Sequence, residues 1–274
     1  MMARKKKYFI SEIICILLSF SVLLPVYMLV INSFKDAASA AEMRLTLPKE
    51  WLIVANYTEL IKEINLLKTF TNSVFISVIT VTIVIITSGM AAFIVQRRKT
   101  ALVQNIYKII SLALIIPPSM VNIYFLAQKL QLTSGFMGII LVLSTLNFAI
   151  ATFLYVGFYK SIPMELDESA VMDGCSPLKL FFKIIFPLLK PITITVLIIT
   201  FMAVWNDFNA SIFFLNNPKK YTMVMTAYFF FGQKASDWHL VFADVLLTSL
   251  PVVLLYFFLQ KQVLSGMTSG AVKG

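Results

Sequence analysis

The sequence predicts an all-α membrane protein with six transmembrane helices. Of its 274 residues, 59% are hydrophobic and only 13% are charged, whereas soluble domains carry about 25% charged residues. Several apolar runs reach the roughly 20 residues that a helix needs to cross a hydrocarbon core. These runs lack the alternating pattern of barrel strands, so we expect helices. The predicted spans are residues 8–31, 72–95, 105–127, 135–158, 184–207 and 240–261.

The first predicted span, 8–31, follows a basic N-terminal stretch but is longer than the apolar part of a signal peptide, which has about 7–15 residues. We therefore expect it to remain as a span. Glu12 lies near its start, where an acid must reach the interface or find a partner. The loop 32–71 is long enough to hold a short helix, and its Trp51 and Tyr57 are residues typical of a membrane interface.

Prolines mark the third and fifth predicted spans. Pro117 and Pro118 lie inside the third, where each removes a backbone donor, so we expect a kink or an interruption. In the fifth span, Pro187 suits the first turn of a helix, and Pro191 predicts a bend soon after it.

Basic residues predict the orientation. With the N-terminus in the cytoplasm, fourteen of the 23 Lys and Arg residues fall on the inner side, and five of the remaining nine lie in loop 32–71. An excess of basic residues on the cytoplasmic side is the usual orientation signal. Six spans then place both termini and the segment 159–183 in the cytoplasm. The net charge of +10 is explained in this way, without a nucleic-acid partner.

The sequence offers no catalytic group. It has no phosphate-binding loop, and neither its two cysteines nor its single histidine, His239, has metal-ligand spacing. We therefore expect no catalytic residue and no metal site. Asp207 and Asp244 lie near the ends of the last two spans, where structural or capping roles are expected. A transport function would need energy from a partner.

The polar segment 163–174 lies between two apolar spans. Pro163 can open a helix, and Gly174 is well placed to end it as a C-cap. Ser169 and Ala170 are small and would permit close approach of another protein. Carboxylates in the first turns suit the helix dipole, namely Glu165, Asp167 and Glu168. The segment predicts a docking helix for a partner; the alternative is a loop that merely connects two spans.

The same segment resembles a family motif. The loop motif of binding-protein-dependent ATP-cassette importer permeases reads Glu-Ala-Ala, three residues, Gly, nine residues, Ile-x-Leu-Pro. Here it is matched by Glu168-Ser169-Ala170, Gly174, Ile184 and Pro187, with Ser for the first Ala and Phe186 for Leu. Further matches to the carbohydrate branch of the family cover the whole chain: Pro25, Ser33-Phe34-Lys35, Asn72-Ser73, Pro163-x-Glu165-Leu166-x-Glu168, Asp173-Gly174, Trp205-Asn206-Asp207-Phe208 and Gly270 to Gly274.

The resemblance, which is to the shorter, maltose-permease-type subunit, implies one MetI-like permease domain over residues 1–274 of a bacterial cell membrane protein. It implies four kinds of protein or ligand partner besides membrane lipid: a second homologous permease subunit, two ATP-binding cassette subunits, an extracytoplasmic solute-binding protein and a sugar. ATP and Mg would be bound by the ATPase subunits and no cofactor by this chain. The residues implied to couple to the ATPase are Glu165, Glu168, Ser169, Ala170, Asp173 and Gly174.

Uncharged polar residues within the spans are candidates for a substrate pathway: Asn122, Tyr124, Asn147, Thr193 and Thr248. A buried amide such as Asn147 either faces the pathway or makes an interhelical hydrogen bond. The lack of charge favours a sugar over a polyamine or glycerol phosphate carried by the same architecture. A self-sufficient channel or secondary carrier is a further alternative, which the absence of an internal repeat disfavours.

Overall fold

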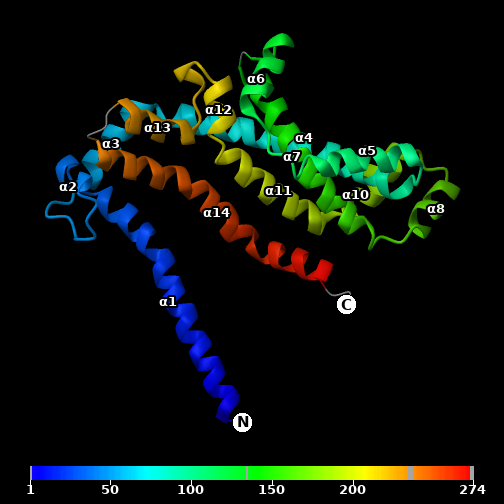
Figure 1. The fold of residues 1–274 in the computed structure, drawn as a ribbon, viewed down its shortest axis with the longest axis horizontal. Helices are drawn as coiled ribbons and strands as arrows, with labels where there is room; N and C mark the ends of the chain where they lie inside the picture. The colour runs from blue at the N-terminus through cyan, green and yellow to red at the C-terminus, as the bar shows by residue number, and fades with distance from the viewer. Residues whose placement is uncertain (1, 134, 234–236, 272–274) are drawn as a thin grey trace. The chain divides into compact units, whose positions relative to one another are not determined.

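A computed structural model of the chain describes residues 2–133, 135–233 and 237–271. It describes the side chains of residues 12–133, 135–228, 230 and 237–260. All regular elements in these residues are helical (Figure 1), so the predicted all-α class is confirmed. The chain divides into two compact units, Met1–Leu67 with Met223–Leu250, and Lys68–Thr222 with Pro251–Gly274.

The first unit contains α1 (Met2–Asn32), α2 (Ala37–Ala41), α3 (Ile53–Ile64), α13 (Met223–Gln233) and the first part of α14 (Trp238–Ala271). The predicted short helix in loop 32–71 is confirmed by α2 and α3. Every side chain of α1 from residue 12 to 27 is exposed within the unit. Apolar residues of α3, α13 and α14 form its small core: Leu60, Ile64, Phe230, Leu240 and Ala243.

Polar side chains fix the chain where α1 ends. The Lys35 ammonium is buried, and it donates hydrogen bonds to Asn32 Oδ1 at 2.9 Å and to the Arg44 carbonyl at 2.7 Å. Burial lowers the pKa of Lys35. Asn56 of α3 donates to the carbonyls of Ser33 and Lys35, both at 2.9 Å. The stretch 33–35, which carries part of the family resemblance, is thus a joint between α1 and α3.

The second unit contains most of α4 (Leu66–Arg97), then α5 (Ala101–Leu112), α6 (Met120–Lys129), α7 (Phe136–Tyr159) and α8 (Glu165–Met172). They are followed by α9 (Pro177–Lys179), the π-helix η1 (Leu180–Ile185), α10 (Phe186–Leu188), α11 (Lys190–Trp205), α12 (Asn209–Phe214) and the 3₁₀ turn η2 (Pro218–Lys220). The central helix is α7, which packs against α5, α11 and α12.

Four helices in the described residues are long and apolar enough to cross a membrane: Glu12–Asn32, Leu66–Arg97, Phe136–Tyr159 and Trp238–Gln260. A fifth span exists if Pro177–Leu188 and Lys190–Trp205, which meet at 82°, are counted as one. The predicted count of six is therefore not confirmed. The difference lies in the third predicted span, 105–127.

That third segment is divided into α5 and α6, which have 12 and 10 residues. Pro117 and Pro118 lie between them. Both lack the amide hydrogen that continues a helix, and each disfavours a helical conformation in the residue before it. The predicted interruption is confirmed, and each resulting helix is shorter than the roughly 20 residues of a full span.

The bend in the fifth segment occurs at Leu189, between α10 and α11. Pro187 and Pro191 cannot donate to the carbonyls one turn before them, so two helical hydrogen bonds, one turn apart, are missing. The π-helix η1 precedes α10, and single π turns of this kind occur mostly as bulges within α-helices. The bend that Pro191 predicts is confirmed.

Candidate functional site

The polar segment folds as the short helix α8, which has one exposed face. Glu165 and Glu168 are exposed in its first turn, where the amide ends of the helix favour negative charge. Ser169 is exposed and donates its hydroxyl to the Glu165 carbonyl at 2.8 Å. Met172 continues this face and is 88% exposed. The face therefore combines two exposed carboxylates with an exposed apolar side chain.

A glycine ends α8, as the sequence predicts. Gly174 has a φ of +74°. Its amide donates to Val171 and the amide of Cys175 donates to Ala170, both at 3.0 Å. This pair of bonds is the Schellman arrangement, which requires a left-handed residue. Among the described residues no heavy atom lies within 4 Å of the place a Cβ would take, so the backbone angle and not crowding favours glycine. Asp173, the residue before it, is exposed.

The opposite face of α8 is buried in the second unit. Asp167 and Ala170, three residues apart and therefore on one face, are 8% and 5% exposed. Ala170 belongs to the same apolar cluster as Val95 of α4 and Tyr159 of α7. Its small side chain thus lets α8 pack onto its own chain, a role that the sequence interpretation assigned to contact with a partner.

The buried carboxylate meets Arg97 at the end of α4. The distance from Arg97 Nε to Asp167 Oδ2 is 2.6 Å, and from Arg97 Nη2 to Asp167 Oδ1 it is 3.0 Å. The guanidinium also donates to the carbonyls of Ile162 at 3.5 Å and Pro163 at 3.4 Å. The two charged side chains are 13% and 11% exposed. Sequence reasoning missed this pair, because its members are 70 residues apart and no local periodicity links them.

A second contact joins α4 to the segment after α8. A Cβ on Gly89 would lie 3.5 Å from Phe181 Cζ, so this glycine lets the ring of Phe181 lie close against α4. Phe93 contacts the same ring, with centroids 5.8 Å apart. Tyr159 of α7 donates its hydroxyl to the Gly89 carbonyl at 3.4 Å. The end of α4 is therefore held to α7, α8 and η1.

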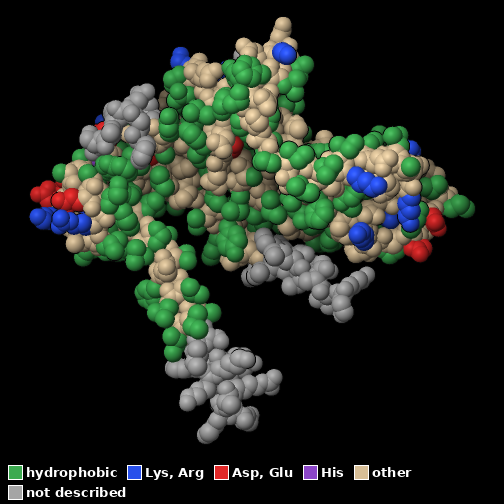
Figure 2. All heavy atoms as spheres, viewed as in Figure 1, with side chains coloured by type: hydrophobic (Ala, Val, Ile, Leu, Met, Phe, Trp, Pro, Cys, Tyr) green, Lys and Arg blue, Asp and Glu red, His purple; other side chains and the backbone are tan. Residues whose placement is uncertain are grey.

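Charged side chains gather on the second unit around α8 and the neighbouring α5, whereas hydrophobic side chains cover much of the face over α7 (Figure 2). The basic residues of segments 98–108 and 160–183, which include part of α5 and all of α8, are Arg98, Lys99, Lys108, Lys160, Lys179 and Lys183. Such a division is typical of a membrane protein near the water interface.

Asp207 caps α12, as the sequence predicts. Its carboxylate accepts hydrogen bonds from the amides of Ala210 at 3.3 Å and Ser211 at 2.9 Å. Burial raises the pKa of Asp207, and these two amide bonds oppose the shift. The Trp-Asn-Asp-Phe stretch that carries part of the family resemblance therefore includes a helix cap.

The pathway candidates have different surroundings. Asn122 is exposed on α6, and Tyr124 packs edge-on against Phe214 at 5.5 Å. Asn147 is 8% exposed and donates to the Leu143 carbonyl of its own helix at 2.8 Å. Thr193 accepts a hydrogen bond from the hydroxyl of Tyr155 at 3.0 Å, across α7 and α11. Thr248 belongs to the first unit. The ring contact of Tyr124 and the hydrogen bonds of Asn147 and Thr193 join none of the four candidates in the second unit to another.

The first unit buries an acid inside α14. Asp244 is 0% exposed, and the hydroxyl of Thr226 lies 3.0 and 2.9 Å from its two carboxylate oxygens. This contact joins α13 to α14, so a structural role, as predicted, agrees with the geometry. His239, five residues earlier, is also buried.

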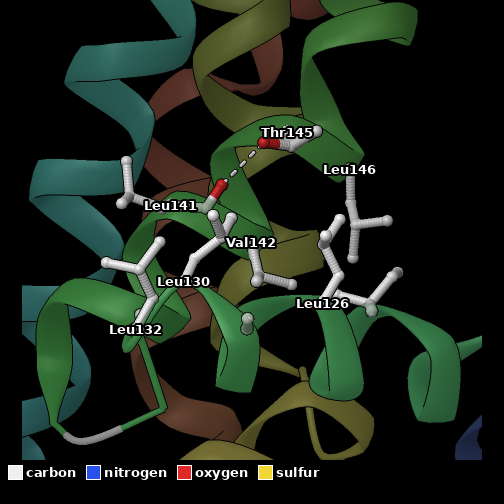
Figure 3. A pocket seen from close by; sticks show the side chains of 10 residues that line it. Leu126, Leu130, Leu132, Leu141, Val142, Thr145 and Leu146 are labelled. Carbon is white, nitrogen blue, oxygen red and sulfur yellow. Dashed lines mark hydrogen bonds between the residues drawn. The ribbon is translucent and has the colours of Figure 1, made fainter.

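A cavity of about 230 Å³ opens between α6 and α7. Its lining is apolar, with Leu126 from α6, Leu130 directly after that helix, and Leu141, Val142 and Leu146 from α7 (Figure 3). Thr145 supplies the hydroxyl on its wall, and this hydroxyl donates to the Leu141 carbonyl of its own helix at 2.8 Å. A polar ligand needs converging polar groups, so the cavity does not suit a sugar.

The helical fold, its long apolar helices and the polar helix α8 between them are those of a multi-pass membrane protein. Residues 85–269, more than half of the chain, match the family described as "Binding-protein-dependent transport system inner membrane component". The chain belongs to this family.

Relatives match over nearly the whole length. The chain is 34% identical to the melibiose/raffinose/stachyose import permease protein MelC of Bacillus subtilis, with 99% of each chain covered. It is 34% identical to the probable starch degradation products transport system permease protein AmyC of Thermoanaerobacterium thermosulfurigenes, with 94% of each covered.

A solved structure shares the fold. It is a bacterial ABC transporter involved in the import of the acidic polysaccharide alginate, and it matches with a TM-score of 0.80 at 19% identity, covering 94% of this chain and 96% of that chain. At this identity the likeness concerns the fold alone. The expected MetI-like permease fold is confirmed.

Proposed function

We propose that this chain is the transmembrane permease subunit of an ATP-driven sugar importer. One observation carries the proposal: the chain is 34% identical over 99% of its length to a sugar import permease. In this function the chain forms half of the translocation pathway as one permease domain, residues 1–274, and performs no chemistry itself. It binds no cofactor, and ATP and Mg are bound by partner subunits.

The coupling site is the exposed face of α8. Glu165 and Glu168 project from its first turn, where they would meet a basic group on an ATPase subunit. Ser169 and Asp173 lie beside them, and Gly174 sets the turn that follows. ATP-driven closure of the ATPase dimer would move α8, and the spans would follow as rigid bodies to give alternating access.

The proposed assembly contains a second, homologous permease subunit, two ATP-binding cassette subunits and an extracytoplasmic solute-binding protein. Both termini and the segment 159–183 lie in the cytoplasm. The basic residues around α8 support this orientation, because such residues are enriched on the cytoplasmic side of membrane proteins. In a chain with Cys15→Ser and Cys175→Ala, cysteine labelling of intact cells should modify the exposed position 45 and leave the exposed position 172 unmodified; the opposite pattern would reverse the orientation.

The proposed cargo is a neutral sugar or short oligosaccharide. The candidate pathway residues are uncharged, and the named relatives act on melibiose, raffinose, stachyose and starch degradation products. The alginate transporter shows that this fold also serves an acidic cargo, so the fold does not decide the charge of the substrate. Selection between neutral and charged cargo must come from side chains and from the binding protein.

The proposal is tested on the complex purified from native membranes and reconstituted in proteoliposomes. Melibiose, raffinose and stachyose are expected to stimulate ATP hydrolysis, whereas glycerol phosphate and putrescine are not. Stimulation by the charged solutes alone would overturn the sugar assignment. Uptake of a solute by the chain reconstituted without ATPase subunits would overturn the proposal that it belongs to an ATP-driven importer.

The coupling site is tested by Glu168→Lys, which places like charge against the proposed basic partner. We expect the variant to insert in the membrane but to recover less ATPase in purification. Lys160→Glu, a charge change of the same size outside α8, is the control and should recover the ATPase normally. Normal assembly and uptake with Glu168→Lys would remove the docking role of α8.

A further inference from the structure

We infer that Arg97 and Asp167 are positioning residues that join α8 rigidly to α4, so that a movement of α8 is transmitted directly to the second predicted span. The inference rests on the proposed function, in which α8 receives the movement from an ATPase. It goes beyond that function because it names the route by which the movement enters the spans.

The geometry of the pair is specific. Arg97 contacts both oxygens of Asp167, at 2.6 and 3.0 Å, and in the same fork reaches the Ile162 and Pro163 carbonyls just before α8. Planar two-point contact of this kind fixes orientation as well as distance, which a lysine cannot do. One side chain of α4 thus holds both the first turn of α8 and the chain leading into it.

The contact lies on the face of α8 that is turned away from the proposed partner. Asp167 and Ala170 are buried against the second unit, while Glu165 and Glu168 are exposed. A force applied to the exposed face therefore acts on a helix whose other face is fixed. Without that attachment, α8 would be connected to the spans mainly by its flanking loops.

Neighbouring contacts extend the body that moves with α8. Gln96, next to Arg97, donates to the Val156 carbonyl of α7 at 2.8 Å. The Gly89 position lets Phe181 of η1 lie against α4. The end of α4 is therefore bonded to α7, α8 and η1 within a few turns, and we expect these segments to move together.

The first test asks whether transport becomes uncoupled from ATP hydrolysis. It uses the whole complex with its partner subunits in proteoliposomes, and raffinose is the transported probe. Asp167→Asn and Arg97→Gln should still assemble with the ATPase and hydrolyse ATP. The raffinose moved per ATP hydrolysed should fall about fivefold or more, the lower end of typical coupling effects. Arg98→Gln is the matched control, since Arg98 is the exposed neighbour, and its ratio should equal that of the unmodified chain.

Two further variants sharpen this test. Arg97→Lys keeps the charge but loses the fork, so it should lower the ratio, while the exchange of Arg97→Asp with Asp167→Arg should recover part of it. An unchanged raffinose-to-ATP ratio in both Asp167→Asn and Arg97→Gln would overturn the inference. A purely structural pair would lower yield and hydrolysis together and leave the ratio constant.

A distance measurement covers the case in which the variants fail to fold. Spin labels at positions 94 and 172, both exposed, report the separation of α4 and α8 in a chain with Cys15→Ser and Cys175→Ala. The distance should be the same in the nucleotide-free and ATP-bound complexes. A change of distance with ATP would overturn the rigid link.

Failure of the proposed function has a different signature. In that case no ATPase is recovered with the chain, or Glu168→Lys leaves assembly and uptake normal. Either result means that no ATPase moves α8, and it overturns this inference together with the coupling role. A constant raffinose-to-ATP ratio in the Asp167 and Arg97 variants overturns the inference alone.

Discussion

The junction of α4 with α8 and the interior of the spans use polar groups in opposite ways. At the junction, Arg97 and Gln96 bond to residues of α8, its preceding loop and α7. Within α4 and α7, the hydroxyls of Thr82 and Thr145 and the amide of Asn147 donate to carbonyls four residues earlier in their own helix. Polar groups of the first kind fix helices to one another, and those of the second kind do not.

The difference follows from the solvent. A polar group in a bilayer must be satisfied nearby, and the closest acceptor is a carbonyl of its own helix. Near the water interface an ionised pair costs less to form, so charge can be used to set geometry. Helix association inside the spans therefore depends mainly on apolar packing, such as that of Val84, Ile192 and Val196, with the hydrogen bond from Tyr155 of α7 to Thr193 of α11 as an exception.

Asp244 is an informative exception, because it is an acid inside a span. Its contact is with the hydroxyl of Thr226 at 2.9 and 3.0 Å, whereas Asp167 meets a guanidinium. Asp244 therefore has a neutral partner, whereas Asp167 has a charged one. Removing the partner should cost more for the charged pair, since the remaining charge is left buried.

The largest expected effect is that of Asp167→Ala. It leaves the Arg97 guanidinium buried without its carboxylate, and we expect a loss of about 3–5 kcal/mol in the free energy of unfolding, typical of a broken buried pair. Unfolding in mixed micelles measures the loss. Glu168→Ala, on the exposed face of the same helix, should change it by no more than about 0.5 kcal/mol. Equal effects of the two variants would end the distinction between the faces.

The second prediction concerns the acid in the span. Asp244→Ala leaves the buried Thr226 hydroxyl without this partner, and we expect a loss of about 1–3 kcal/mol in the free energy of unfolding. Asp244→Asn keeps the shape and a hydrogen bond to Thr226, so it should cost less than the alanine variant. If the asparagine variant were the more damaging, the acid would be acting through its charge, as Asp167 does.

The third prediction concerns the end of α8. Gly174→Ala places a Cβ at a φ of +74°, which costs roughly 1–2 kcal/mol for a left-handed residue. Gly157→Ala is the matched control: among the described residues no atom lies within 4 Å of its Cβ position, it lies inside α7, and alanine there should be neutral or stabilising. Thermal unfolding of both variants measures the difference, and a stabilising Gly174→Ala would contradict the observed cap.

The smallest expected effect is that of Asn147→Ala. Because the Asn147 amide donates to its own helix, its loss should cost about 0.6 kcal/mol in the free energy of unfolding and should leave sugar-stimulated ATP hydrolysis nearly unchanged. A larger change for one sugar than for another would place Asn147 in the substrate pathway. No change with melibiose, raffinose or stachyose would make it a packing residue.

Much of the fold could be predicted because it depends on neighbouring residues. The first, second, fourth and sixth predicted spans each coincide with an observed helix, and most of the predicted ends lie within several residues of the observed ones. They could be predicted because a long apolar run must be helical in a bilayer. The breaks at Pro117 and Pro191 follow from missing amide hydrogens. The C-terminal part of the resemblance, Gly270 to Gly274, reaches beyond the described residues.

The sequence by itself determined that this chain is helical and membrane-embedded, where its helices break, and that α8 ends at Gly174, because these features depend on covalent geometry and on neighbours within one turn. Tertiary structure alone decided which face of α8 is free. The eight residues of α8 carry too short a pattern to show that Asp167 and Ala170 turn inward. That choice is made by Arg97, a residue 70 positions away, and a pairing over such a distance becomes visible only when the helices are packed.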